Sequence, residues 1–334
     1  MKLFLRADFG LAVTLIAALA VAPCELLAQP LSPATVWPAK PIRLIVPFAA
    51  GGSTDVVARS LAAGLQEAWA QPVVLDLRPG AGGTIGSELA ARAAADGYTL
   101  LIGSVSTHAI APHVYTKLPY DPVRDFTPVS EIVQFPTLLV ANPALPVRNL
   151  RELVSLARKR PGELTYASNG IGTNSHVAGE LLKHTAGIDL VHVPYKGGAP
   201  AVADVVGGHV AIAFSGASNV LPYLNAGRLR VLGVASRVRS PVVPEVPTII
   251  ESGLADFEVT IWLGLWAPPG LPVDLVNRVH TAAIAVLRSP RLRDLAVAQG
   301  AEIVGSTPAA FAQRVREELA RWKRLIALAG VKPE

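Results

Sequence analysis

The stretch "IRLIVPFAAGGSTDVVARSL", residues 42–61, joins an apolar run, a turn of small residues and an amphipathic segment. The apolar run predicts a buried strand, and the periodic segment after it predicts a helix. Between them, Ala49, Ala50, Gly51 and Gly52 let the backbone approach a neighbouring group closely. Because a helix N-terminus presents unpaired N–H groups and a partial positive charge, this turn predicts a place for an anion.

The same unit of strand, polar loop and helix recurs along the chain. The loops are rich in Gly, Ser, Thr and Asn, and they follow apolar runs at residues 42–48, 72–77, 98–103, 164–168, 189–195 and 210–214. This alternation predicts βαβ units around parallel sheets whose two faces are covered. Three units in each half indicate two similar α/β lobes. Since ligands lie beyond the carboxyl ends of such strands, the six loops are expected to line one cleft.

Two extended segments predict the crossings between the lobes: one contains Asn142, Pro143 and Pro146, and the other, residues 257–272, is an apolar strand that ends in Pro268, Pro269 and Gly270. The hinge is expected near residues 141–146 and 257–267. Paired crossings make a hinge. We therefore assign residues 37–141 and 262–334 to the first lobe and residues 142–261 to the second. Two C-terminal helices, at about 273–288 and 308–329, are expected to return to the first lobe, and the second has an apolar stripe of Phe311, Val315, Leu319, Trp322 and Ile326.

Residues 1–28 have the pattern of a secretory signal peptide. Lys2 and Arg6 precede an apolar stretch at residues 9–23, which is shorter than the ~20 residues that span a membrane, and small residues follow it. We expect cleavage after Ala28 and a periplasmic protein. Lipoprotein anchoring at Cys24 is the alternative, and Pro23 argues against it. Cys24 is the single cysteine of the chain, so the mature protein is expected to hold no disulfide.

The sequence gives little support to several classes of function. The net charge of +5 is scattered, and the aromatic residues (6%) do not alternate with basic ones, so nucleic-acid binding is not indicated. No phosphate-binding glycine loop with its lysine, no G-x-S-x-G elbow and no paired-histidine metal motif occurs. We expect no cofactor, no metal and no catalytic residue, and hence not an enzyme. A two-lobed hydrolase or lyase is the alternative.

The predicted cleft is instead rich in hydrogen-bond donors. Its candidate ligand-binding residues are small or polar loop residues: Gly51, Gly52, Ser53, Thr54, Asp55, Gly82, Gly83, Ser104, Ser106, Ser168, Asn169 (or Asn174), Thr173, Ser175, His176, Tyr195, Lys196 and Ser215. Each has an ordinary structural alternative. The glycines suit tight turns, Thr54 suits a helix N-cap, and Tyr195 and Lys196 suit packing and the surface. A few hydrogen bonds to a charged group, at roughly 1.5–3 kcal/mol each, are enough to hold a carboxylate.

Four long segments resemble one known family. They are "WPAKPIRLIVPFAAGGSTDVVAR" (37–59), "RPGAGGTIGSELAARAAADGYTLLIGS" (78–104), "VHVPYKGGAPAVADVVGGHV" (191–210) and "GRLRVLGVASRVRSPVVPEVPTIIESG" (227–253). On these segments the chain resembles the Bug, or TctC, family of extracytoplasmic solute-binding receptors of tripartite tricarboxylate transporters. The resemblance extends from about Trp37 to Ala327. It implies a type II periplasmic-binding-protein-like fold that closes by hinge motion.

The resemblance also implies a small carboxylate ligand and a membrane permease as partner. It implies that backbone groups of the first two loops, with ordered water, hold the proximal carboxylate at Phe48, Gly51, Gly52, Ser53, Gly82 and Gly83. From the second lobe it suggests Ser168, Gly170, Thr173 and His176. One departure from the family pattern places Ala211 and Ser215 where acids are often found. This disfavours an amino-acid ligand and favours a simple or aromatic carboxylate.

We thus expect a monomeric periplasmic receptor that delivers a small carboxylate to a tripartite tricarboxylate-type permease. A receptor that serves a sensor or signalling system is the alternative. The identity of the carboxylate is not readable from these residues.

Overall fold

The first three predicted strands pair in parallel, as their continuous apolar sequences require. In the computed structural model, which describes residues 37–331, β1 (Ile42–Val46) lies between β2 (Val73–Leu77) and β3 (Thr99–Ser104). Ile42, Leu44, Ile45 and Val46 are fully buried. The predicted signal peptide at residues 1–28 lies outside the described residues.

Helical segments follow each of these strands at its carboxyl end. They are α1 (Ser53–Trp69), the 3-10 turn η1 (Ala81–Gly83) with α2 (Thr84–Ala91), and the π-helical turn η2 (Ser106–Ile110) with α3 (Ala111–Val114). The three strand–loop–helix units predicted for the first half of the chain are therefore present.

The second half repeats the arrangement. β5 (Thr165–Ser168) pairs in parallel with both β6 (Val191–Pro194) and β7 (Ile212–Gly216). The helices of this half are α4 (Leu150–Lys159), α5 (Asn174–Ala186), α6 (Gly198–Val206) and α7 (Ala217–Asn225). Thr173 caps α5, where its side chain accepts a hydrogen bond from the His176 N–H. The three predicted units of this half are also present.

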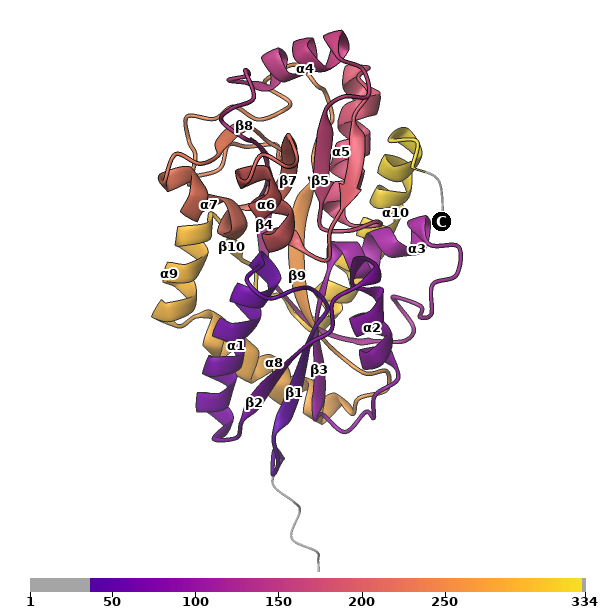
Figure 1. Ribbon diagram of the computed structural model, residues 1–334. Helices are drawn as coiled ribbons and strands as arrows, with labels where there is room; N and C mark the ends of the chain where they lie inside the picture. Colours follow the sequence, from indigo (N-terminus) through magenta and orange to yellow (C-terminus); the bar gives the residue numbers. More distant parts are fainter. Residues whose placement is uncertain (1–36, 332–334) are drawn as a thin grey trace, which may run out of the picture. The chain divides into compact units, whose positions relative to one another are not determined.

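Antiparallel strands connect the two groups. The 15-residue strand β4 (Thr127–Ala141) pairs with β9 (Thr260–Ala267) over Thr127–Pro136 and with β7 from Thr137 onward. β4 also pairs with β10 (Glu302–Ile303) at Val133 and Gln134 and with β8 (Arg230–Val234) over Leu138–Ala141. Figure 1 shows β4 and β9 running between the group with β1–β3 and the group with β5–β7. The fold is thus a two-lobed α/β fold with two strand crossings.

The first crossing lies within β4, at Pro136–Thr137, a few residues before the first of the two predicted hinge segments. β4 is longer than the apolar run suggested, because polar residues such as Ser130 and Gln134 continue its pairing with β9. The residue limits that we assigned to the lobes stay a prediction. Below, the first lobe means the elements around β1–β3, and the second lobe means those around β5–β7.

The C-terminal helices pack on the first lobe and on the crossing strands. They are α8 (Val273–Leu287), α9 (Pro290–Gln299) and α10 (Pro308–Leu328). Two of them also contact helices of the second lobe, α10 against α5 and α9 against α7. The predicted stripe of α10 is confirmed for Phe311, Val315, Trp322 and Ile326, which are buried. The helix α9 was not predicted; Pro290 occupies its first turn, where its missing N–H costs nothing.

A buried carboxylate fixes α10 against β9. Glu318 is 1% exposed, and its Oε2 accepts hydrogen bonds from Trp262 Nε1 and Trp322 Nε1, both at 3.0 Å. Its Oε1 accepts from Arg321 Nη1 at 3.2 Å. Because Trp262 belongs to β9, this network holds α10 to one of the two crossing strands.

Candidate functional site

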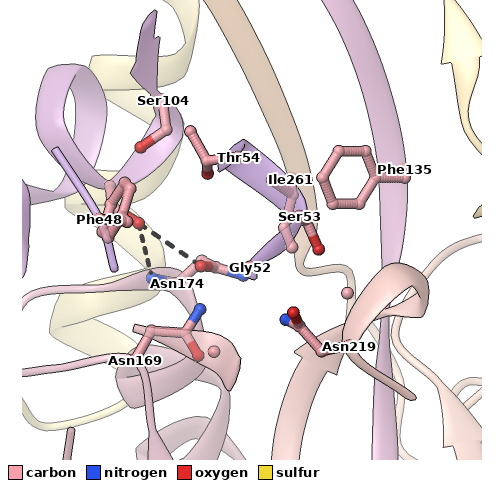
Figure 2. A pocket seen from close by; sticks show the side chains of 13 residues that line it. Phe48, Gly52, Ser53, Thr54, Ser104, Phe135, Asn169, Asn174, Asn219 and Ile261 are labelled. Carbon is pink, nitrogen blue, oxygen red and sulfur yellow. Dashed lines mark hydrogen bonds between the residues drawn. The ribbon is translucent and has the colours of Figure 1, made fainter. Parts of the chain in front are cut away.

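A narrow cavity lies where the carboxyl ends of the strands from both lobes meet. Its volume is about 30 Å³, and Figure 2 shows its lining from close by. The lining residues come from both lobes and both crossing strands: Phe48, Gly52, Ser53, Thr54, Ser104, Ser106, Phe135, Asn169, Asn174, Gly198, Gly216, Asn219 and Ile261.

Four helices begin at this cavity. Ser53, Asn174 and Gly198 are the first residues of α1, α5 and α6, and Gly216 is the N-cap of α7. Each start presents backbone N–H groups without intrahelical partners and the positive end of the helix dipole. Among the described residues, those that line the cavity carry no ionised side chain. The electrostatics of the site therefore come from backbone and side-chain dipoles, and their sign suits an anion.

The first loop is braced from within. The Gly51 N–H donates to Asp55 Oδ2 at 2.8 Å, and Arg59 Nε donates to the same oxygen at 3.0 Å. Gly51 has a φ of +79°, a conformation that glycine adopts without strain. Gly51 and Asp55 do not line the cavity. Asp55 thus positions the turn, whereas the N-cap of α1 is Gly52, not Thr54, and it leaves the first turn without a side-chain cap.

The second loop lies beside the cavity rather than on its lining. A Cβ at Gly82 would come within 2.4 Å of the Ile171 carbonyl oxygen, and one at Gly83 would come within 2.7 Å of the Thr107 methyl group. Both glycines have positive φ. Close packing against the second lobe and beneath Phe48, whose ring lies 3.1 Å from that Gly83 Cβ, requires glycine here.

The third loop contributes two hydroxyls. Ser106 Oγ accepts from the Asn174 N–H at 3.2 Å and donates to Asn174 Oδ1 at 3.4 Å, as the dashed lines to Asn174 in Figure 2 mark. Ser104 Oγ is buried and has no hydrogen-bond partner. Such an atom is costly to bury and suits a site that receives a polar group.

In the loop between β5 and α5, one residue lines the cavity and others hold the loop in shape. Asn169 lines the cavity, and its buried Oδ1 has no partner. Ser175 Oγ accepts from the Asn169 N–H at 2.8 Å, and Thr173 Oγ1 donates to the Gly170 carbonyl at 2.6 Å. Ser168 Oγ lies 2.6 Å from His192 Nε2. Ser168, Gly170, Thr173 and Ser175 therefore shape the loop from behind and do not line the cavity.

His176 does not line the cavity. Its Nδ1 accepts from the Gly172 N–H at 3.3 Å, and its ring stacks on His192 with centroids 4.4 Å apart. Burial lowers the pKa of His176, and burial, with His176 close by, lowers the pKa of His192 to about 3. Both rings are therefore neutral at neutral pH, and neither is placed to act on a molecule in the cavity.

The remaining predicted residues also lie outside the lining. Tyr195 donates from its hydroxyl to Asp204 Oδ2, and burial raises the pKa of Tyr195 to about 12. The Lys196 side chain is exposed, and only its carbonyl reaches the first lobe, where it accepts from the Ala49 N–H at 3.3 Å. Ser215 Oγ accepts from Asn219 Nδ2 at 2.8 Å and so orients that amide.

The lining thus includes seven of the residues predicted for ligand contact: Phe48, Gly52, Ser53, Thr54, Ser104, Ser106 and Asn169. Six lining residues were not among the predicted ligand contacts: Phe135, Asn174, Gly198, Gly216, Asn219 and Ile261. Asn174 was named in the sequence analysis as the alternative to Asn169 for supplying a side-chain amide to the cleft. Gly198, Gly216 and Asn219 stand in the same polar loops and could have been found there. Nothing in the sequence marks Phe135 and Ile261 as cavity residues, because an apolar residue within an apolar strand is expected in the hydrophobic core.

Residues 37–331 lack two other features. No group of three or more His, Cys, Asp or Glu side chains in this part is arranged to hold a metal ion. Nor does this part contain a helix with the length and hydropathy to cross a membrane.

Comparison with known proteins identifies the family. Residues 57–331 match the model of the tripartite tricarboxylate transporter family receptor, TctC. The periplasmic binding protein BugD is 35% identical, with a TM-score of 0.86 over 89% of this chain and 100% of that chain.

Two further solved structures contain carboxylates. The Rhodopseudomonas palustris protein Rpa4515 with adipate is 38% identical, with a TM-score of 0.87 over 89% of this chain and 100% of its own. MatC from the same organism, with bound malate, is 35% identical, with a TM-score of 0.84 over 86% and 99%. With this family match and this two-lobed fold, the chain belongs to the TctC, or Bug, family of solute-binding receptors, which are periplasmic binding proteins and not enzymes.

Proposed function

We propose that this chain is a periplasmic receptor that closes on a small carboxylate and delivers it to a tripartite tricarboxylate-type permease. The observation that carries the proposal is the convergence of four helix N-termini on a cavity whose lining has no ionised side chain. Relatives of similar fold hold adipate and malate.

The polar lining favours an acid without an amine. An ammonium group would need a carboxylate, and the lining of the cavity presents none. The apolar side chains Phe48, Phe135 and Ile261 cover part of the lining and suit a carbon chain or ring. The proposed ligand is therefore a small aliphatic or aromatic carboxylate.

The lobes touch directly around the cavity. Tyr115 donates to the Ile171 carbonyl at 2.8 Å, and Ser218 donates to Ser53 Oγ. With a volume of about 30 Å³, far below the ~300 Å³ of ordinary ligand pockets, the cavity has room for only part of a dicarboxylate. We propose that the lobes separate about β4 and β9 to admit the ligand, which then stabilises the closed state by its higher affinity for it.

The ligand-binding residues in this proposal are those of the lining, braced by Asp55, Ser175 and Thr173 behind it. Capture before a permease also requires export, for which residues 1–28 are the proposed signal peptide. The chain is proposed to act as a monomer.

A thermal-shift screen of mono-, di-, tri- and aromatic carboxylates, followed by calorimetric titration, tests the proposal. A ligand at 100 times its Kd adds about 2.7 kcal/mol of stability. Gly52→Trp fills the cavity and should abolish binding of the best acid. Gly52→Ala is the matched control, because its Cβ would meet nothing closer than 3.6 Å, and should retain most of the affinity. Unaltered affinity in Gly52→Trp would show that the cavity is not the site.

A further inference from the structure

A second cavity lies on the opposite side of the crossing strands. In the β4–β9 ladder, Phe135 pairs with Ile261, and both residues line the cleft described above. Their neighbours Pro136 and Thr260 also form a pair, and they line the second cavity. Because successive side chains of a strand point to opposite faces, the two cavities lie on opposite faces of the same two strands. Phe135 borders both.

Both lobes contribute walls to this hinge cavity, as we call it. Residues 236–241, which follow β8, come from the second lobe; residues 300–302 and Arg314 of α10 come from the elements packed on the first. The floor is formed by residues 134–136 of β4 and by Glu258 and Thr260. Its volume is about 390 Å³, within the range of small-molecule sites, whereas the cleft has about 30 Å³.

Two buried hydrogen-bonding atoms of the hinge cavity have no partner. Ser240 is 2% exposed, and its Oγ makes no hydrogen bond. Arg314 Nε is also buried and unpartnered, although Arg314 Nη2 lies 3.7 Å from Glu318 Oε1. A guanidinium N–H can only donate, and an unpaired buried donor costs roughly 1–3 kcal/mol. A ligand with a hydrogen-bond acceptor would satisfy these donors.

The carboxylates that line the cavity are already engaged. Glu258 Oε2 accepts from Arg237 Nε at 2.8 Å, and Glu302 Oε2 accepts from Gln134 Nε2 at 2.8 Å. The groups of the cavity that still lack a hydrogen-bond partner are therefore donors. Phe135, Pro136, Val238, Pro241 and Ala301 supply apolar atoms to the lining, which also includes the cations Arg237 and Arg239.

We propose that the hinge cavity is a second binding site, which takes a small organic acid with one carboxylate on a compact apolar body. The carboxylate is held by Ser240 and Arg314, and the apolar body lies against Pro136 and Val238. Such a molecule contacts both lobes at once, behind the strands about which they move. The proposal does not depend on the ligand of the cleft.

The test uses benzoate as the probe in a Gly52→Trp background, in which the cleft is filled. Calorimetric titration is expected to show saturable binding of one benzoate, and no binding of benzamide, which has the same ring without the charge. Adding Val238→Trp, a substitution at a 73% exposed cavity residue, should abolish it. Val273→Trp on α8 is the matched control at a 72% exposed valine outside the cavity, and it should leave benzoate binding unchanged.

Ser240→Ala tests the polar contact separately. It removes a hydroxyl that has no partner, so the thermal midpoint without benzoate should stay the same, and the Kd for benzoate should rise about fivefold or more. Absence of benzoate binding in the Gly52→Trp protein, or binding that persists with Val238→Trp, overturns the hinge site. Failure of the cleft proposal gives a different result: the best acid from the screen would bind Gly52→Trp as tightly as it binds wild type.

Discussion

Removing the hydrogen bond from the Tyr115 hydroxyl to the Ile171 carbonyl tests lobe closure directly. This bond joins the end of α3 in the first lobe to the β5–α5 loop in the second at 2.8 Å. Tyr115→Phe removes this bond but keeps the ring, which packs against Gly172. Only conformations in which the lobes touch should be affected.

The magnitude follows from the value of one neutral hydrogen bond. A net contribution of about 0.5–1.5 kcal/mol to the closed state converts into a rise of roughly 2- to 12-fold in the Kd of the cleft ligand. The upper part of this range applies if the Ile171 carbonyl finds no water in the closed state. The free energy of unfolding of a ligand-free, open protein should not change.

Calorimetric titration of the best acid from the screen into wild type and Tyr115→Phe measures this difference. Tyr98→Phe is the matched control, since its hydroxyl accepts from the Ala39 N–H at 3.0 Å away from the second lobe, and its Kd should equal that of wild type. An unchanged Kd in Tyr115→Phe, or the same loss in both variants, would refute the view that these contacts form on ligand capture.

Three other variants give separate expectations. Asn219→Ala removes a lining amide whose Oδ1 has no partner, so the Kd of the cleft acid should rise about fivefold or more by titration. The thermal midpoint should fall, because the buried Ser215 Oγ loses the hydrogen bond from Asn219 Nδ2, and a retained Kd would remove Asn219 from the site. Glu318→Ala leaves the buried indole N–H groups of Trp262 and Trp322 without their acceptor and removes one of the acceptors of Arg321. It should cost about 3–5 kcal/mol in urea unfolding, and a loss below about 1 kcal/mol would contradict the network. Burial lowers the pKa of His108 to about 3, so the folded protein keeps this ring neutral while the unfolded chain protonates it below about pH 6.5. Stability should therefore be complete above pH 6.5 and fall by up to about 1.4 kcal/mol per pH unit toward pH 3; His108→Phe should lessen this slope in unfolding at pH 7 and 5, and an unchanged slope would rule His108 out as its source.

The lining residues in loops could be predicted from the sequence, whereas those in strands could not. Ser53, Ser104 and Asn169 were accessible to sequence reasoning because each stands in a polar loop directly after an apolar strand. Phe135 and Ile261 were not, because their role depends on which face of β4 and β9 is turned to the cleft. Asp55 and Ser175 were predicted for ligand contact; in the structure Asp55 Oδ2 and Ser175 Oγ each accept from a backbone N–H of their own loop.

The order of residues by itself determined the repeated strand–loop–helix units, the parallel strands around β1 and β5, and the neutral, donor-rich character of the loops. These follow from local periodicity and from the backbone freedom of glycine, which act over a few residues. Only the tertiary structure decided where β4 passes from one sheet to the other, which loop residues reach the cavity and which brace it, and that a second cavity lies behind the crossing strands. Those outcomes depend on register and on contacts between segments more than a hundred residues apart, as between Gln134 and Glu302, for which local sequence carries no signal.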